Sequence, residues 1–150
     1  MADDIKIREA TASDVPRIVE MGKNFLMNGP YRDQLGNPDD ATKFCFSMLV
    51  NTKAKIIVSE SDGHVTGVFA FIVFPHYFSG ELTSGEMIWY VDPECRKGGA
   101  ALKLLAEAEK LSRALGSKRM QLTAPSEEVG SLYRFCGGYK KIEVCYQRSL

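Results

Sequence analysis

The stretch VDPECRKGGAALKLLAEAEKL, residues 91–111, joins a strand-like apolar run to an amphipathic helix through a basic, glycine-rich corner. The preceding run EMIWYV, residues 86–91, predicts a strand covered on both faces, which Pro93 ends. A helix is expected from about Gly99 to Leu115. A glycine-rich turn before a helix offers unpaired N–H groups and the positive end of the helix dipole to phosphate. The corner therefore predicts an anion site, and a tight solvated turn is the simpler alternative.

The composition restricts what that anion can be. Nineteen Lys and Arg balance nineteen Asp and Glu, so no overall field attracts nucleic acid or anionic membranes. The corner also lacks the G-x-G-x-x-G and G-x-x-x-x-G-K-[ST] patterns of dinucleotide and triphosphate sites. We expect a local site for another phosphate-bearing ligand and no bulk nucleic-acid binding.

Length, cysteines and hydropathy indicate the class of protein. The 150 residues predict a single domain, 1–150. The cysteines form no C-x-x-C pair, which favours reduced thiols in a cytoplasm, with Cys95 and Cys136 as packing residues. The two histidines show no metal-ligand spacing, so no metal is expected. No apolar run approaches the roughly 20 residues that span a bilayer, so no membrane segment is expected.

Strand-like and helix-like segments alternate along the chain without repeats or long linkers. Strands are expected over 5–10, 55–61, 64–74, 86–91, 119–124 and 139–149, and helices over 11–26, 41–50, 99–115 and 126–136. Ser13 is a candidate N-cap, and Asp62-Gly63 predicts a tight antiparallel turn. This order predicts an α/β (α+β) domain with a mixed sheet.

The corner resembles a known cofactor signature. Residues 91–101 are similar to the acyl-coenzyme A motif R/Q-x-x-G-x-G/A of the GNAT superfamily of N-acetyltransferases, with Arg96, Gly99 and Ala101 at its defined positions. The resemblance extends to I-R-x-A-T-x-x-D at residues 7–14 and covers almost the whole chain. It implies a GNAT-like, mostly antiparallel sheet flanked by helices, with the fourth and fifth strands splayed apart. It also implies acetyl-coenzyme A (acetyl-CoA) as co-substrate.

The resemblance assigns the cofactor to the corner and to the strand before it. Pantetheine is expected beside the backbone near Trp89 to Val91, and the pyrophosphate on amides from Lys97 to Leu102. The implied cofactor-binding residues are Tyr90, Val91, Arg96, Lys97, Gly98, Gly99, Ala100, Ala101 and Leu102. Lys97 and Ala101 stand where the family commonly has glycine, and Gly98 is expected to supply the lost turn freedom.

Acetyl transfer to an amine needs a base for the amine, a donor for the oxyanion and an acid for the leaving thiolate. Similarity to the family implies Tyr133, in SLYRFCGGY, as the acid, although Tyr133 could instead simply pack on the sheet. It implies Glu86 as the base, for which a solvated edge residue is the alternative. The N–H of Val91, or of a neighbour at an expected bulge, would donate to the oxyanion.

The acceptor would lie between two loops, residues 24–38 and 75–85. The expected substrate-binding residues are Phe25, Tyr31, His76 and Tyr77. Their aromatic and mixed-charge surroundings suit a small-molecule amine and a protein or peptide amine equally well. His76 is a second candidate base. The sequence leaves open a homodimer, a non-catalytic acyl-CoA binding or sensor module, and a purely structural domain.

Overall fold

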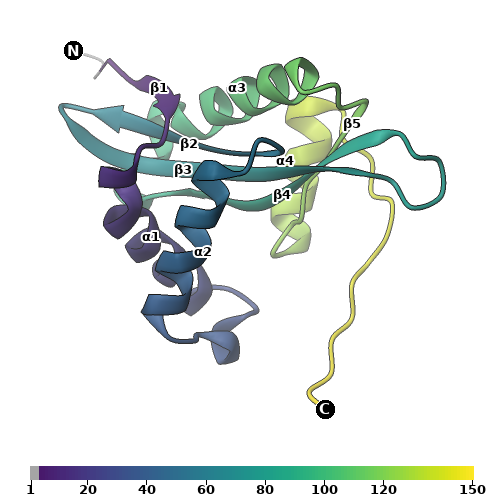
Figure 1. Cartoon of the computed structure of the whole chain (residues 1–150), viewed down its shortest axis with the longest axis horizontal. Coiled ribbons are helices and arrows are strands. Elements are labelled where there is room, and N and C mark those ends of the chain that lie inside the picture. Colours follow the sequence, from purple (N-terminus) through teal and green to yellow (C-terminus); the bar gives the residue numbers. More distant parts are fainter. Residues whose placement is uncertain (1–3) are drawn as a thin grey trace.

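The computed structural model describes residues 4–150, apart from the side chain of Cys136, as a twisted sheet flanked by helices (Figure 1). The strands are β1 (Lys6–Glu9), β2 (Ala54–Ser61), β3 (His64–Pro75), β4 (Leu82–Val91) and β5 (Arg119–Gln121), in that spatial order. Neighbours from β1 to β4 are antiparallel, whereas β5 is parallel to β4. The mixed, mostly antiparallel sheet expected from the sequence is confirmed.

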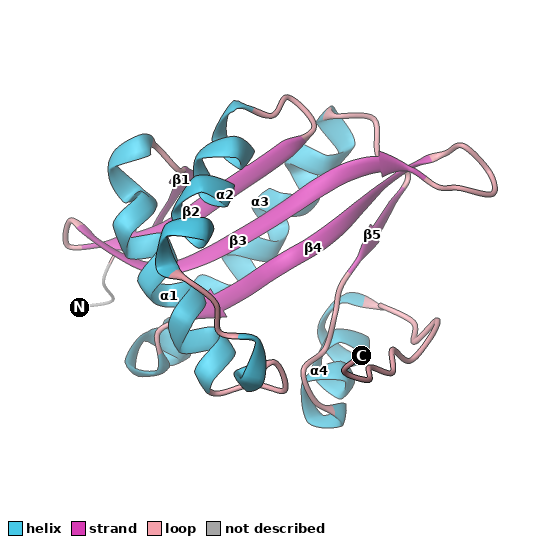
Figure 2. Ribbon diagram, turned by 60° about the horizontal axis from the view of Figure 1, so that its bottom comes forward, coloured by secondary structure: helices cyan, strands magenta, loops and turns pink. Residues whose placement is uncertain are grey.

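Helices cover both faces of this sheet (Figure 2). They are α1 (Val15–Met27), α2 (Pro38–Val50), α3 (Ala100–Ala114) and α4 (Glu127–Gly137), with 3₁₀ turns η1 (Ala12–Asp14), η2 (Arg32–Gln34) and η3 (Pro93–Gly98). α1 and α2 pack on one face and α3 packs on the other. The expected boundaries are close, but α2 begins three residues early because the Asn37 side chain accepts a hydrogen bond from Asp39 N.

The central strands divide the core into two layers because alternate residues face opposite sides of the sheet. The layer under α1 and α2 contains Val15, Ile18, Met21, Cys45, Met48, Ile56, Val58, Val68, Ala70 and Tyr90. The layer under α3 contains Ile57, Phe69, Phe71, Val73, Val91, Ala100, Leu104, Leu105 and Ala108. β4 contributes to both layers, as its apolar sequence predicted.

Two local predictions have different outcomes. Asp62 and Gly63 both have positive φ, 51° and 77°, so the tight turn between β2 and β3 is confirmed. Ser13 is not the helix cap. Instead, Thr11 and Asp14 form a capping box around η1, in which the Asp14 carboxylate accepts from Thr11 N at 2.8 Å.

The prediction of a strand over residues 139–149 is wrong, since no residue of the described chain after β5 belongs to a strand. The alternation of Ile142, Val144 and Tyr146 indicates extended backbone, but a strand also needs a neighbouring edge for its hydrogen bonds. The segment instead runs away from the sheet, with these three side chains exposed (Figure 1). Lys141 forms an ion pair with Glu127 of α4 at 3.2 Å.

A bulge and a short pairing separate β4 from β5. Ala70 of β3 lies opposite Ile88 and Phe71 lies opposite Glu86, so Met87 is the extra residue on β4. β5 pairs only with Thr83–Gly85, and the two strands then diverge (Figure 2). The expected splay is confirmed. Because β4 begins at Leu82, Glu86 stands in mid-strand and not at the strand start, where the sequence predicted it.

Candidate active site

The edge of β4 beyond β5 presents free backbone groups. Asp92 N donates to Thr66 O of β3 at 2.9 Å. Because strand amides alternate in direction, the N–H groups of Trp89 and Val91 point away from β3, into the splay. The bulge expected next to Val91 lies earlier, at Met87. An extended amide-containing ligand can therefore pair with this edge as a further strand would.

The corner after β4 leaves amides available at the start of α3. The first helical bond runs from Lys103 N to Gly99 O at 3.2 Å, so the N–H groups of Ala100, Ala101 and Leu102 precede the ladder. Gly99 has φ +84°, and a Cβ there would meet nothing within 4 Å. Gly99 therefore supplies the turn freedom that was expected of Gly98, and the space beside it is open for a phosphate group.

Arg96 fastens the corner to the strand that precedes it. Its Nε donates to Val91 O at 2.8 Å, and its guanidinium carbon lies 5.6 Å from the centre of the Tyr90 ring. Arg96 and Lys97, the next residue, are both exposed, and Arg96 is the one whose contacts connect the corner to β4.

An ion pair holds the corner against α1. Asp92 is 8% exposed and forms an ion pair with Arg17, whose Nε also donates to Val65 O at 3.2 Å. Burial raises the pKa of Asp92, while Arg17 acts in the opposite direction. Sequence reasoning missed this contact. A charged residue directly after an apolar strand was its only signal.

Glu86, in the middle of β4, is half-buried beside the segment that follows β5. Its carboxylate accepts a hydrogen bond from Thr123 N at 3.0 Å. Burial raises the pKa of Glu86 to about 7, although the Thr123 bond acts to lower it. A carboxyl group that loses its proton near neutral pH is suited to act as a general base.

Tyr133 of α4 lies beside Glu86. Its hydroxyl donates to Thr123 O at 3.1 Å, so Glu86 and Tyr133 bind the N–H and C=O groups of the same residue. Burial, and then the charge of Glu86, raise the pKa of Tyr133 above its usual value. The phenol therefore keeps its proton at neutral pH. Thr123 contributes only backbone here, so no side-chain pattern could have identified it.

The Tyr133 ring covers the indole of Trp89, with ring centroids 5.4 Å apart. On its other side Trp89 meets Phe69, at 5.7 Å. The indole Nε1 is buried and has no hydrogen-bond partner among the described residues. Trp89 thus places the phenol of Tyr133 over the splay between β4 and β5.

Two consecutive glycines, Gly137 and Gly138, end α4 before Tyr139. Gly138 has φ +68°, and a Cβ on Gly137 would lie 2.8 Å from the Tyr139 ring. The chain therefore folds back so that this ring packs over Gly137. Burial, and then the charge of Glu109 of α3, raise the pKa of the Tyr139 hydroxyl above its usual value. The glycine pair allows the end of α4 to fasten to α3.

The four residues expected to bind the acceptor do not come together. Phe25 packs against the core layer that contains Tyr90, and Tyr31 directly precedes η2. His76 and Tyr77 stack at 4.7 Å in the turn between β3 and β4, where Tyr77 is 92% exposed. That turn lies at the opposite end of β4 from the corner, roughly 30 Å along a ten-residue strand.

Residues 4–150 contain neither a candidate metal-binding cluster nor a candidate membrane-spanning helix. No three His, Cys, Asp or Glu side chains in that range are grouped so as to hold a metal ion. None of the helices in that range is both long and apolar enough to cross a membrane.

Several solved structures share this fold. A transcriptional regulator from Bacillus halodurans C-125 superposes with a TM-score of 0.82 at 17% identity, over 98% of this chain and all of its own. Glucosamine-6-phosphate N-acetyltransferase from Arabidopsis thaliana has a TM-score of 0.78 at 14% identity, over 98% of this chain and 99% of its own. A predicted acetyltransferase with acetyl-CoA from Clostridium acetobutylicum has a TM-score of 0.77 at 16% identity, over 97% and 96%.

No curated protein matches the sequence. The model of the acetyltransferase (GNAT) family matches residues 25–137, which include the free edge of β4, the corner and Tyr133. The resemblance first indicated by the corner is therefore confirmed. Because the match spans most of the sequence, the chain belongs to the acetyltransferase (GNAT) family.

Proposed function

We propose that this protein transfers an acetyl group from acetyl-CoA directly to a primary amine, with both substrates bound together. The observation that carries the proposal is the arrangement around Thr123. A carboxylate with a pKa of about 7 and a protonated phenol bind the two backbone groups of one residue, beside the free edge of β4. Base and acid are thus held in one place.

The site has the features that acetyl-CoA requires. The free amides of Ala100 to Leu102 and the open space at Gly99 suit its pyrophosphate. The outward-facing N–H groups of Trp89 and Val91 suit its pantetheine arm and the thioester carbonyl. When bound, acetyl-CoA supplies an activated acyl group.

Each chemical requirement then falls to a residue of this chain. Glu86 takes a proton from the acceptor ammonium, which frees the nitrogen lone pair to form the new C–N bond. The outward N–H groups of β4 stabilise the oxyanion that forms. As the C–S bond breaks, Tyr133 exchanges its bond to Thr123 O for one to sulfur and donates its proton there. The proton that the new amide nitrogen then loses restores the phenol.

We further propose Phe25, Tyr31, His76 and Tyr77 as acceptor contacts from two separate walls. The Arabidopsis relative is named for N-acetylation, which supports an amine acceptor. A small-molecule amine and a protein or peptide amine both fit this proposal. Among the described residues Cys45 and Cys145 form no disulfide, which supports action in the cytoplasm.

The test is release of coenzyme A from acetyl-CoA across a panel of small amines, peptides with free N-termini and lysine peptides. We expect amine-dependent release that falls in both Glu86→Gln and Tyr133→Phe. Binding of acetyl-CoA without release, for every amine, would instead identify a sensor module. Absence of binding would contradict the assignment of the cofactor site.

A further inference from the structure

A cavity of about 240 Å³ opens between α3, β5 and the end of α4. The side chains that matter for its chemistry are Glu109, Ser112, Arg113, Lys118, Arg119 and Tyr139. Ser112 follows Gly99 by thirteen residues, which places the cavity roughly 20 Å along α3 from the corner. It is therefore distinct from the proposed acetyl-CoA site.

A buried hydroxyl group without a partner lines this cavity. Ser112 is 4% exposed, and its Oγ has no hydrogen-bond partner among residues 4–150. A buried polar group left in this state is costly. Beside it, Ser117 Oγ shares a hydrogen bond of 2.6 Å with Ser84 Oγ. A ligand group that reached Ser112 Oγ would supply the missing hydrogen bond and remove the cost.

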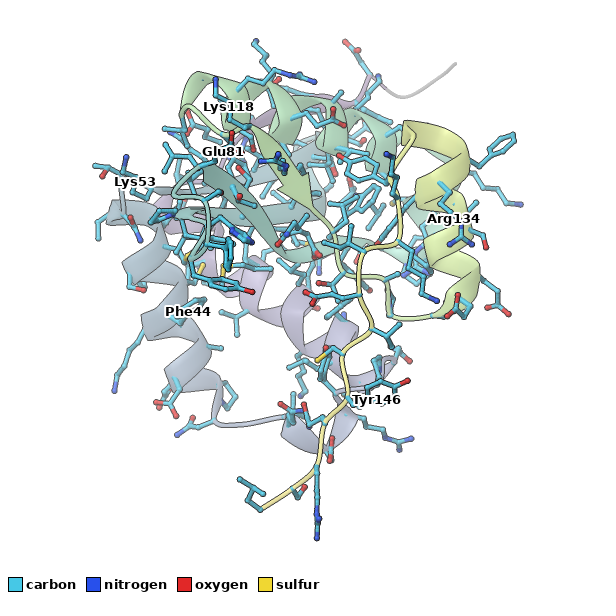
Figure 3. The ribbon with its side chains drawn as sticks, turned by 90° about the vertical axis from the view of Figure 1, so that its right-hand side faces the viewer. Phe44, Lys53, Glu81, Lys118, Arg134 and Tyr146 are labelled. Carbon is cyan, nitrogen blue, oxygen red and sulfur yellow. The ribbon has the colours of Figure 1, made fainter. Side chains whose placement is uncertain are left out.

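The charge around the cavity is positive. Three of the lining side chains are cations, and one, Glu109, is a carboxylate. Glu109 forms an ion pair with Arg113 at 3.3 Å. Arg119 forms an ion pair with Glu81, and Lys118 also helps to lower the pKa of Glu81. Figure 3 shows Lys118 and Glu81 at the same end of the molecule. In a chain with no net charge, this local excess favours an anion.

We propose that this cavity binds a small anion through phosphate or carboxylate oxygens, with Ser112 donating a hydrogen bond and Lys118 supplying charge. The bound anion connects α3, β5 and the end of α4. α4 carries Tyr133, so the anion acts as an effector that fixes the helix of the proposed acid. Binding itself does not depend on the proposed acetyl transfer.

The direct test is a ¹⁵N NMR titration of the whole chain at constant ionic strength, with inorganic phosphate in one arm and malonate in the other. We expect saturable shifts of the amides of Ser112, Lys118 and Gly138. Saturation by phosphate alone identifies a phosphate ligand, and saturation by malonate alone identifies a carboxylate ligand. Linear shifts in both arms would overturn the proposal.

Three variants locate the anion. Lys118→Gln should weaken binding about tenfold and Ser112→Ala about fivefold, as expected for one charged and one neutral hydrogen bond. Lys97→Gln removes the same charge at the corner and should leave this affinity unchanged. Spectra of each variant without ligand verify folding. If Lys97→Gln weakens binding as much as Lys118→Gln, the anion lies at the corner and the proposal is wrong.

Discussion

The ring of Tyr133 stacks on the indole of Trp89, with planes 21° apart and centroids 5.4 Å apart. The contact joins α4 to the free edge of β4 and is largely independent of the phenol hydroxyl. Trp89 is also the only tryptophan of the sequence. Tryptophan fluorescence therefore reports on the surroundings of Trp89, which include the Tyr133 ring, and the position of that ring can be measured separately from its chemistry.

Tyr133→Phe tests the proposed acid while keeping the stack. We expect kcat to fall about 100-fold because the proton donor is lost, with little change in the Kd of acetyl-CoA or in Trp89 emission. Tyr133→Leu, which removes the ring, should alter the emission as well. An unchanged kcat in the phenylalanine variant would remove Tyr133 from the mechanism.

Glu86 should control the pH dependence of turnover. Its pKa of about 7 predicts that kcat/KM rises with pH as the carboxyl loses its proton, levelling off above neutrality. Glu86→Gln should lower the rate and abolish this acidic limb. If the limb persists in the variant, a group other than Glu86 acts as the base.

The same carboxyl should make stability depend on pH. Its pKa is raised from 4.5 to about 7, so the folded state favours the protonated form, and the stability gained from it is lost as pH rises through 7. Above pH 7, the free energy of unfolding of Glu86→Gln should therefore exceed that of the wild type by up to about 3 kcal/mol. At pH 4 this gain should be absent.

Glu81→Gln is the control for this measurement. Arg119 lowers the pKa of Glu81, so its contribution is present above pH 4.5 and lost only below it. The difference between Glu81→Gln and wild type should stay level between pH 5 and 8. If the stability difference between Glu86→Gln and the wild type were also constant between pH 5 and 8, Glu86 would be solvated in the folded protein.

Gly99→Val should prevent cofactor binding at the corner. Acetyl-CoA at about 100 times its Kd should stabilise the wild type by about 2.7 kcal/mol, a melting shift of about 5–10 °C. Valine disfavours φ +84° and fills the open space beside the free amides, so the shift should disappear.

Gly98→Ala is the matched control, because its Cβ meets only Ile5 Cδ1 at 3.4 Å and the backbone there has no positive φ. It should keep the melting shift. Arg96→Ala should reduce the shift only in part, since the amides remain. A wild type without any shift at saturating acetyl-CoA would contradict the cofactor assignment.

The sequence alone was sufficient to predict those features that a few adjacent residues determine. Asp62-Gly63 specified its hairpin, and the residues from Arg96 to Ala101 specified both the corner and the family. Contacts between distant segments were not predictable in this way. Arg17 meets Asp92 across 75 residues, and Glu86 is held by the backbone of Thr123. No local pattern encodes either contact.

The prediction of a last strand failed for a related reason. Alternation in residues 139–149 describes which way side chains point in extended backbone, and it says nothing about the edge with which that backbone would pair. The glycine pair Gly137-Gly138 is equally visible in the sequence. Its purpose became evident only from the Tyr139 ring that folds over Gly137.

The bulge at Met87 has a consequence for comparing this chain with its relatives. Glu86 and Trp89 are three residues apart, yet both lie opposite phenylalanines of the same core layer, Phe71 and Phe69. In a regular strand, two neighbouring side chains on the same face of the sheet are two or four residues apart. An alignment to a relative whose fourth strand is unbulged must therefore open a one-residue gap at Met87, or it will pair Glu86 with a residue on the opposite face.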